Sequence, residues 1–519
     1  MMQTQMNAAP RDFRAQHDLP PGFMTFYRPL HDEFTPRQKA LVVKRAEALG
    51  AAHQGRLPAH LPPSAATRDD WKIVLPEWCR DQRNQMMGPA DDTARVVRML
   101  NSGAPGVVLD LEDSMANRWP CLMRGLCNIL GALRGDLIYS DPASGATVAI
   151  EPSSTVVWIR VRGLDLGQGG LFPGGEISPA PLFDLAMIAH QLDANRLRRP
   201  LCIYIPKAES AEEASWWRDV FRAVARAKGW TDDAIRCMAL VESHPLAHEM
   251  EEFLHPLRDH ILGLSFERWD YTASLIHFNF ENPDWVLPDR NTIPHDVPFL
   301  QRVRLLLTDI CHRRGALAIG GPTRLCPNRE NPDLNARALA LLEQEKQNEA
   351  TCFMDGTWTG HPDQTAIAVA RFPVPNQLHR RAEGIERYPD LRPVPHGVGA
   401  RTAEGTRVAV SAMIRYRNGV LNGRGASLLD GCMEDLATDR INRLMIAQRI
   451  RHRRAAEVMN GGGKPAPHSK EFVRHKFNEA LELLIQQLPS GRDPGDERTL
   501  REALRLSEEM IGRGWFKPE

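Results

Sequence analysis

Four short apolar runs in this chain end on charged residues whose side chains could do chemistry together. The runs are VVLDLED (107–113), VVWIRVRG (156–163), MALVES (238–243) and ILGLSFERWDY (261–271). Each is rich in β-branched residues or leucine, as a buried strand is, and ends near a carboxylate or an arginine. In a barrel of parallel strands the carboxyl ends meet on one face, so these side chains would surround one cavity. The pattern predicts an enzyme, with side chains that could together hold a metal ion and an enolate.

Glu242 and Asp270 lie at the ends of two consecutive predicted strands. Mg²⁺ prefers carboxylate oxygens and usually takes only one or two from a protein, with water and substrate completing its coordination. The pair therefore indicates a magnesium site. The structural alternative is that each carboxylate caps the following helix or pairs with an arginine such as Arg268. The residue types alone leave these two interpretations about equal.

Arg160 and Lys207 end the third and fourth predicted strands. A buried guanidinium must face anions, because burying its charge unpaired is prohibitive. Arg160 could bind a substrate carboxylate, stabilise a developing oxyanion, or pair with Asp110, Glu112 or Asp113. Both can hold, since those carboxylates could orient the arginine. Lys207 could form a Schiff base or bind phosphate, but nothing in the sequence indicates the lowered pKa that a covalent role needs.

The bulk composition is that of an ordinary soluble globular protein. At 519 residues the chain is too long for one core, so two or three domains are expected. Lys+Arg (65) equals Asp+Glu (65), so no overall field favours nucleic acid or an anionic membrane. Nine scattered cysteines without a CxxC pair argue against disulfides and zinc and favour reduced thiols in the cytoplasm. We find neither a secretory signal nor the ~18 apolar residues of a membrane span.

Alternating strand and helix patterns begin at about residue 83. Amphipathic stretches at 182–192, 211–228, 299–314 and 334–346 separate several of the strands. Such units predict a (β/α)₈ TIM barrel in the α/β class. A doubly wound open sheet would give the same alternation and is the alternative. The eight candidate strands are 85–88, 106–111, 155–160, 201–207, 237–242, 261–266, 316–321 and 352–356.

The segments on either side of the barrel are predicted to be helical. A helix at 35–50 has Thr35 as N-cap, Pro at N1 and Gly at its end, after a loosely ordered segment of about thirty residues. A Pro-rich linker at 371–396 precedes helices at 435–457, 470–488 and 497–511. We therefore expect an N-terminal helical clasp (1–81), the barrel (82–375) and a C-terminal helical domain (376–519). Asp435 reads as an ordinary helix cap, and residue types alone give no reason to assign it catalysis.

Several segments together resemble the malate synthases, specifically the A-type enzymes of the citrate-lyase-like TIM-barrel superfamily. They include LDLEDSMANRW (109–119), RVRGLDL (160–166), YIPKAESAEEASWWRDVF (204–221), GLSFERWDY (263–271), DGTWTGHP (355–362) and CMEDLAT (432–438), in the family's order. The resemblance implies a TIM barrel with a helical plug over the active site. It also implies condensation of acetyl-CoA with glyoxylate, followed by hydrolysis of the malyl thioester. We expect a cytoplasmic monomer with no nucleic-acid or membrane partner.

The resemblance also assigns roles to individual residues. Glu242 and Asp270 fall on the Mg²⁺ ligands, Arg160 on the catalytic arginine, and Asp435 on the base. A fixed guanidinium would let a weak base remove a thioester methyl proton, because it stabilises the enolate oxygen as it forms. The residues expected to bind substrate or to support the site are Asp110, Glu112, Asp113, Trp269 and Lys207.

The chain departs from the family pattern beside the expected metal ligand. Glu267 stands where the family usually has glycine, and its carboxylate could crowd the pocket, join the metal or point to solvent. Two alternatives to malate synthase therefore stay open. One is a malyl-CoA or citramalyl-CoA lyase that acts on a related acyl-CoA and 2-oxo acid. The other is a barrel relative that binds CoA without catalysis.

Overall fold

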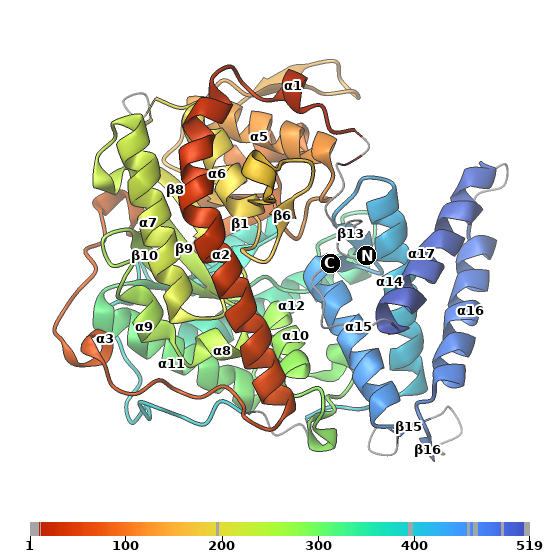
Figure 1. Ribbon diagram of the computed structural model, residues 1–519. Coiled ribbons are helices and arrows are strands. Elements are labelled where there is room, and N and C mark those ends of the chain that lie inside the picture. Colours follow the sequence, from red (N-terminus) through yellow and green to blue (C-terminus); the bar gives the residue numbers. More distant parts are fainter. Residues whose placement is uncertain are drawn as a thin grey trace.

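Eight parallel strands close into a barrel at the centre of the structure (Figure 1). This computed structural model describes residues 10, 12–193, 197–392, 398–453, 457–459, 465–488 and 493–512. Neighbouring strands run in the order β1-β12-β11-β10-β9-β8-β5-β2, so the TIM barrel is confirmed and the open sheet is excluded. The strands are β1 (Asn84–Pro89), β2 (Gly106–Asp110), β5 (Val156–Arg160), β8 (Leu201–Ile205), β9 (Ile235–Val241), β10 (Ile261–Phe266), β11 (Leu317–Gly320) and β12 (Gly356–Thr359).

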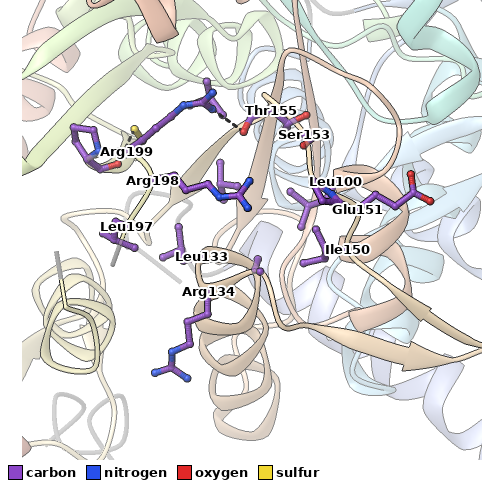
Figure 2. Close-up of a pocket in the computed structure, with 17 residues that line it drawn as sticks. Leu100, Leu133, Arg134, Ile150, Glu151, Ser153, Thr155, Leu197, Arg198 and Arg199 are labelled. Carbon is purple, nitrogen blue, oxygen red and sulfur yellow. Dashed lines mark hydrogen bonds between the residues drawn. The ribbon is translucent and has the colours of Figure 1, made fainter. Parts of the chain in front are cut away.

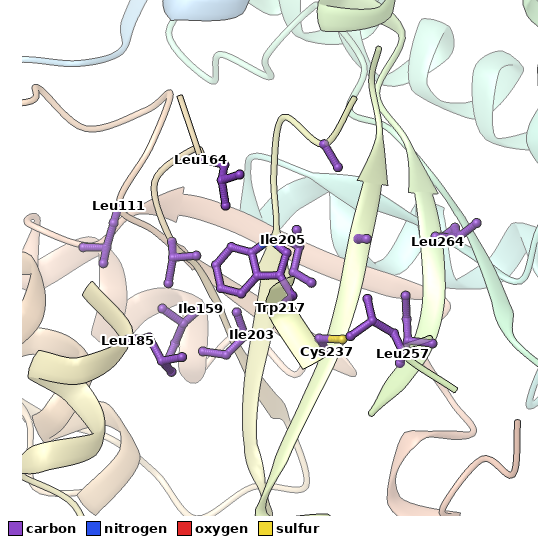
Figure 3. Packing of buried hydrophobic residues seen from close by; sticks show 14 of the residues in the cluster. Leu111, Ile159, Leu164, Leu185, Ile203, Ile205, Trp217, Cys237, Leu257 and Leu264 are labelled. Atoms are coloured by element: carbon purple, nitrogen blue, oxygen red, sulfur yellow. The ribbon is translucent and has the colours of Figure 1, made fainter. Parts of the chain in front are cut away.

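The strands are apolar throughout because both of their faces are buried. In β2 all five residues are buried, with Val107 and Leu109 packed toward the outer helices and Val108 toward the barrel interior. Parallel strands covered on both faces read as continuous apolar runs, which is why the sequence located seven of them within a few residues. Figure 3 shows the outer layer, where Trp217 packs beside Ile203 and Ile205 of β8.

The eighth predicted strand, 352–356, is wrong in position. Helix α12 (Pro332–Thr351) runs further than predicted and buries Glu349 and Ala350 in its last turn. Cys352 is its C-cap, and Phe353 takes a left-handed backbone with φ 64°. The chain must turn through this segment before it can enter the barrel, so the strand begins only at Gly356.

The helices around the barrel mostly match their predicted ranges. Helix α7 spans the predicted 211–228, and α6, α11 and α12 overlap the other three predicted ranges, whereas α4, α5, α8, α9, α10 and α13 were not predicted. The outer helices are α4 (Thr93–Leu100), α5 (Trp119–Arg134), α6 (Ala180–His190), α7 (Ala211–Lys228), α8 (His244–Ala247), α9 (Met250–Leu254), α10 (Arg268–Phe278), α11 (Pro298–Arg314), α12 and α13 (Thr365–Arg371).

The N-terminal helix α2 begins earlier than predicted. It spans Phe23–His53, crosses the outside of the barrel (Figure 1) and contains Pro29 and Pro36. Phe23 and Tyr27 are buried against Phe183 of α6, so tertiary burial outweighs the start signal at Thr35. Thr35 hydrogen-bonds with His31 instead of capping a helix. The expectation of loose order to about residue 30 is thus wrong from Phe23 onward, and residues 1–9 and 11 lie outside the described ranges.

Four C-terminal helices build a second apolar core beside the barrel. They are α14 (Ala403–Leu421), α15 (Leu436–Arg451), α16 (Lys470–Gln486) and α17 (Pro494–Gly512). Ala273 and Ile276 of α10 belong to the same core, which fixes this region against the barrel (Figure 1). Helix α14 was not predicted. The predicted linker has no helix or strand from 372 to 392, and 393–396 and 454–456 lie outside the described residues.

Short elements complete the described fold. Among the helices that the structure describes, none is both long and apolar enough to cross a membrane. The short elements are α1 (Ala15–Asp18), α3 (Ala65–Arg68) and the two-stranded pairs β3 (Ile138–Ser140) with β4 (Thr147–Ala149), β6 (Gly167–Gln168) with β7 (Ser178–Pro179), β13 (Ser427–Leu429) with β14 (Cys432–Glu434), and β15 (Val458–Met459) with β16 (Pro465–Ala466).

Candidate active site

Asp110 and Arg160 form a buried, bidentate ion pair at the mouth of the barrel. They are register partners on β2 and β5, and Arg160 Nε and Nη2 donate to the two Asp110 oxygens, each at 2.6 Å. The backbone N–H groups of Glu112 and Ser114 also donate to Asp110, which fixes its carboxylate. Burial opposes ionisation, yet Arg160 lowers the pKa of Asp110. This anchoring leaves Arg160 Nη1 directed toward the other carboxylates, 3.3 Å from Asp113.

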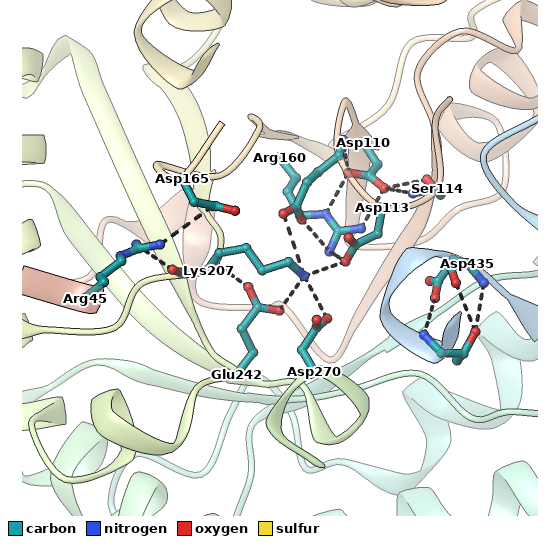
Figure 4. Close-up of polar contacts among 12 residues, drawn as sticks. Arg45, Asp110, Asp113, Ser114, Arg160, Asp165, Lys207, Glu242, Asp270 and Asp435 are labelled. Atoms are coloured by element: carbon teal, nitrogen blue, oxygen red, sulfur yellow. Dashed lines mark hydrogen bonds and ion pairs between the residues drawn. The ribbon is translucent and has the colours of Figure 1, made fainter. Parts of the chain in front are cut away.

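The Lys207 ammonium lies among four carboxylates that follow three different strands, β2, β9 and β10 (Figure 4). Its Nζ is 2.7 Å from Asp113 Oδ2 and 2.8 Å from Asp270 Oδ2. Glu242 Oε2 is 3.4 Å away and Glu112 Oε1 is 3.7 Å away. Glu242 and Asp270 therefore point at one location, as predicted. Lys207 itself reaches that location from a left-handed backbone with φ 52°.

The carboxylates at the mouth outnumber the cations that balance them. Three of their buried oxygens, Glu112 Oε2, Asp113 Oδ1 and Asp270 Oδ1, have no hydrogen-bond partner in the described part of the chain. Burial and neighbouring negative charges raise the pKa of Glu242 to about 8, although Lys207 opposes the shift. Such a site favours an additional cation.

The residue types at the mouth fit a hard divalent ion. Glu242 and Asp270 supply oxygen donors, which Mg²⁺ prefers. Within the described ranges, no group of three or more His, Cys, Asp or Glu side chains is arranged to hold a metal. A site built on two protein carboxylates, completed by water and substrate, agrees with both observations.

Asp435 approaches the mouth from the C-terminal region. It is the N-cap of α15, where its Oδ1 accepts the Thr438 N–H at 3.2 Å and Thr438 Oγ1 accepts the Asp435 N–H at 3.0 Å. The predicted helix cap is thus confirmed. Burial, followed by the negative charges of Asp113 and Asp270, raises the pKa of Asp435 to about 7. Figure 4 shows Asp435 on the far side of the cluster from Lys207.

A buried ion pair fixes the segment that carries Asp435. Arg290 donates from Nη1 and Nη2 to both oxygens of Glu434, the residue immediately before Asp435. The guanidinium groups of Arg268 and Arg290 lie 4.3 and 5.6 Å from the ring centre of Trp269, which also packs against the C-terminal core. The described contacts of Trp269 therefore join the barrel to the C-terminal helices.

A cavity of about 210 Å³ opens toward the cluster between α2, α10 and α15. Glu112, Lys207 and Asp270 form part of its lining, together with residues of the three helices. Arg45 of α2 lines it too and donates to the Lys207 carbonyl at 2.7 Å. No local pattern marks Arg45 in the sequence, because it lies 162 residues from Lys207 on the long helix α2.

A second cavity, of about 200 Å³, lies at the opposite end of the barrel (Figure 2). It adjoins the first residues of β5 and β8 and is lined by Arg134, Arg198 and Arg199 among others. Arg199 donates to the Thr155 carbonyl at 2.8 Å. None of the carboxylates described above lines this cavity, so the chemistry belongs to the other end.

Comparison with known proteins agrees with this geometry. The family model "Malate synthase, TIM barrel domain" matches residues 156–388, and "Malate synthase, C-terminal" matches 400–503. Malate synthase A of Escherichia coli (strain K12) is 33% identical over 500 residues, which cover 94% of this chain and 92% of that protein. A malate synthase of Streptomyces clavuligerus is 35% identical over 513 residues (92% and 94%), and one of Arabidopsis thaliana is 30% identical over 499 residues (93% and 87%). With both of its large parts matched and full-length relatives this similar, the chain belongs to the malate synthase family.

Proposed function

We propose that this protein is an acyltransferase that condenses acetyl-CoA with glyoxylate and hydrolyses the resulting malyl thioester to malate and CoA. Its membership in the malate synthase family supports this reaction. The observation that carries the assignment is the convergence of Arg160, Glu242 and Asp270 at one mouth of the barrel, with Asp435 delivered by another region.

Asp435 is the proposed base. It removes a proton from the acetyl methyl group, and the electron pair moves onto the thioester oxygen to form the enolate. A carboxylate with a pKa of about 7 is better matched to this task at neutral pH than one near 4. The N-cap hydrogen bond to Thr438 holds one carboxylate oxygen in place and so restricts the direction from which Asp435 reaches substrate.

Arg160 is the proposed stabiliser of the enolate oxygen. Asp110 holds its Nε edge, so the guanidinium is already oriented when negative charge develops. Preorganised donors of this kind avoid the cost of reorganisation during the reaction. The enolate carbon then attacks the aldehyde carbon of glyoxylate, and water cleaves the thioester in the second half of the reaction.

Glu242 and Asp270 are the proposed ligands of Mg²⁺. When bound, the ion would polarise the glyoxylate aldehyde and balance negative charge. Lys207 interacts with both carboxylates and keeps them directed at one point, while Glu112 and Asp113 complete the anionic wall around it. These residues and Asp110 orient the reacting groups, and we keep Trp269 as a supporting residue at the junction with the C-terminal helices.

A thiol-release assay tests the function directly. The wild-type protein is given acetyl-CoA and glyoxylate with Mg²⁺ or with a chelator, and the products are identified by mass spectrometry. We expect free CoA and malate only with the metal. Accumulation of a hydroxyacyl-CoA without hydrolysis would instead support the lyase, and no reaction with any acyl-CoA would support a non-catalytic relative.

The domain limits, the oligomeric state and the cellular compartment are also proposals. We infer that 1–81, 82–375 and 376–519 are the three parts of the chain, that it acts as a monomer and that it works in the cytoplasm. All nine cysteines lie in the described residues as free thiols, which suits a reducing compartment. Light scattering on the purified protein tests the monomer.

A further inference from the structure

Glu267 is a buried acid at the barrel mouth to which the proposed reaction gives no role. It follows β10 directly and is only 6% exposed. Its Oε1 has no hydrogen-bond partner, and no ion pair to its carboxylate occurs among the described residues. The next residue, Arg268, is instead paired with Glu345 at 2.9 Å. Buried polar groups are normally satisfied by the chain, so this exception calls for an explanation.

The Glu267 carboxyl is seated against Gly321, just beyond the end of the neighbouring strand β11. A β-carbon built on Gly321 would lie 2.6 Å from Glu267 Oε1, which is closer than real contacts allow. The Gly321 backbone is itself held, because its carbonyl accepts Lys346 Nζ at 2.6 Å and Thr357 Oγ1 at 3.2 Å. The missing side chain at 321 therefore makes the room that Glu267 fills.

Glu267 is also the N-cap residue of α10, three positions before Asp270, so it lies at the same strand end as a proposed metal ligand. The charges that act on it come from Glu242, Arg160, Asp270 and Asp435, the residues that surround the proposed substrate site. Burial, followed by the neighbouring acids, raises the pKa of Glu267 well above its usual value. Glu267 thus occupies buried space at the mouth without an ion pair among the described residues. Its burial excludes the possibility that it points to solvent.

We propose that Glu267 limits the size of the 2-oxo acid that the site accepts. Its carboxyl fills the space into which a substituent on the acceptor's carbonyl carbon would extend. Glyoxylate carries only hydrogen there and fits, whereas pyruvate and longer 2-oxo acids are excluded. This inference rests on the proposed condensation and defines its acceptor. Glu267 acts on the acceptor by steric contact and takes no proton in the reaction.

Two substitutions at Glu267 separate size from charge. Glu267→Ala opens the space, and we expect the ratio of kcat/KM for pyruvate to that for glyoxylate to rise by about tenfold or more, because one methylene changes discrimination by about 10- to 200-fold. Glu267→Gln keeps the size and removes the acid, so the ratio should stay close to that of the wild type. Both are measured by CoA release with acetyl-CoA and Mg²⁺.

The Gly321 contact provides an independent, coupled test. Gly321→Ala should lower kcat/KM for glyoxylate in the wild type, since the new methyl group displaces Glu267 into the pocket. The same change should cost less in Glu267→Ala, where the contact with Glu267 is gone and only the 2.9 Å contact with the Phe266 carbonyl oxygen remains. Gly360→Ala is the matched control, because a β-carbon at Gly360 meets nothing within 4 Å. Additive effects of the Gly321 and Glu267 changes would overturn the proposal.

Binding measurements keep this test distinct from that of the overall function. Thermal shifts with glyoxylate or pyruvate, in the presence of Mg²⁺, report acceptor binding without turnover. If the wild type releases no CoA, the proposed condensation fails, yet Glu267→Ala should still gain a pyruvate-induced shift. A folded Glu267→Ala protein with an unchanged acceptor preference, in turnover and in binding, overturns the inference. So does one that is inactive with every acceptor.

Discussion

Two buried polar clusters occupy the same barrel, and they differ in how completely their atoms are paired. In the interior, Gln82 accepts from Gln85 and Trp158, and Gln85 accepts from Tyr204 and Trp358, at 2.6–3.0 Å. None of these atoms is left without a partner. At the mouth, several buried carboxylate oxygens have no hydrogen-bond partner within the described part of the chain.

This difference in pairing distinguishes a structural network from a ligand-binding site. A closed network of neutral groups satisfies itself and contributes to the fold. A surplus of buried carboxylates is costly to the fold alone, so its retention indicates that something outside the chain completes it. Changes at the mouth should therefore affect turnover and ligand response, whereas changes in the interior should affect stability.

The largest expected effect comes from Asp435→Asn. We expect CoA release to fall by about 10²- to 10⁴-fold, the usual contribution of a general base. Asparagine caps helices as well as aspartate does, so the melting temperature and the Mg²⁺ response should stay unchanged. A variant that keeps wild-type turnover would remove Asp435 as the base and weaken the contrast between the two clusters.

The response to magnesium should distinguish the clusters next. Saturating Mg²⁺, at about 100 times its Kd, should stabilise the wild type by about 2.7 kcal/mol. Asp270→Asn and Glu242→Gln should lose most of this gain, whereas Tyr204→Phe in the interior should keep it. Chemical denaturation with and without the ion measures the effect, and an equal gain in all variants would contradict the assigned ligands.

The pH dependence of turnover should be set by an acid at the barrel mouth, Asp435, and not by the interior network. Asp435 must be ionised to act, and its raised pKa means that the protonated, inactive form accumulates below about pH 7. We expect kcat/KM to fall about tenfold for each pH unit below that value. Bound Mg²⁺ near Asp270 would move the midpoint down, toward lower pH. A profile that falls as pH rises through 7 would have the wrong sign.

The smallest expected effect is in the interior. Tyr204→Phe removes one donor to Gln85 Oε1, which still accepts from Trp358 at 2.9 Å. The loss should cost about 1 kcal/mol of unfolding free energy and leave kcat/KM of the folded protein unchanged. A large loss of turnover without a loss of stability would place the interior network in the catalytic machinery.

The sequence located the barrel and its strand-end residues because burial on both faces leaves apolar runs. Arg160 ends such a run, Glu242 follows one directly and Asp270 lies four residues beyond another, so their convergence could be predicted from fold geometry. Asp435 could not be assigned from residue types, since a helix cap and a base look alike in sequence. Only the family resemblance proposed it as a base.

Other parts of the site depend on contacts that leave no local pattern. Arg45 and Lys207 are 162 positions apart in the chain. The central position of the Lys207 ammonium depends on acids from three other strand ends that meet only in the folded barrel. Helix α2 begins earlier than predicted because Phe23 and Tyr27 are buried against Phe183, which is distant in the sequence. The outcome at Glu267 likewise depended on the empty space at Gly321.

Position 207 requires both a left-handed backbone and a side-chain ammonium group, and no single amino acid provides both without strain. A φ of 52° suits glycine and costs other residues of order 1 kcal/mol or more. Yet glycine has no ammonium group, and that group is what binds the surrounding acids. Lys207→Gly should therefore remove the backbone strain and, at the same time, leave the surrounding carboxylates without the cation that holds them together. At this position the chain accepts a strained backbone in exchange for an ordered set of acids.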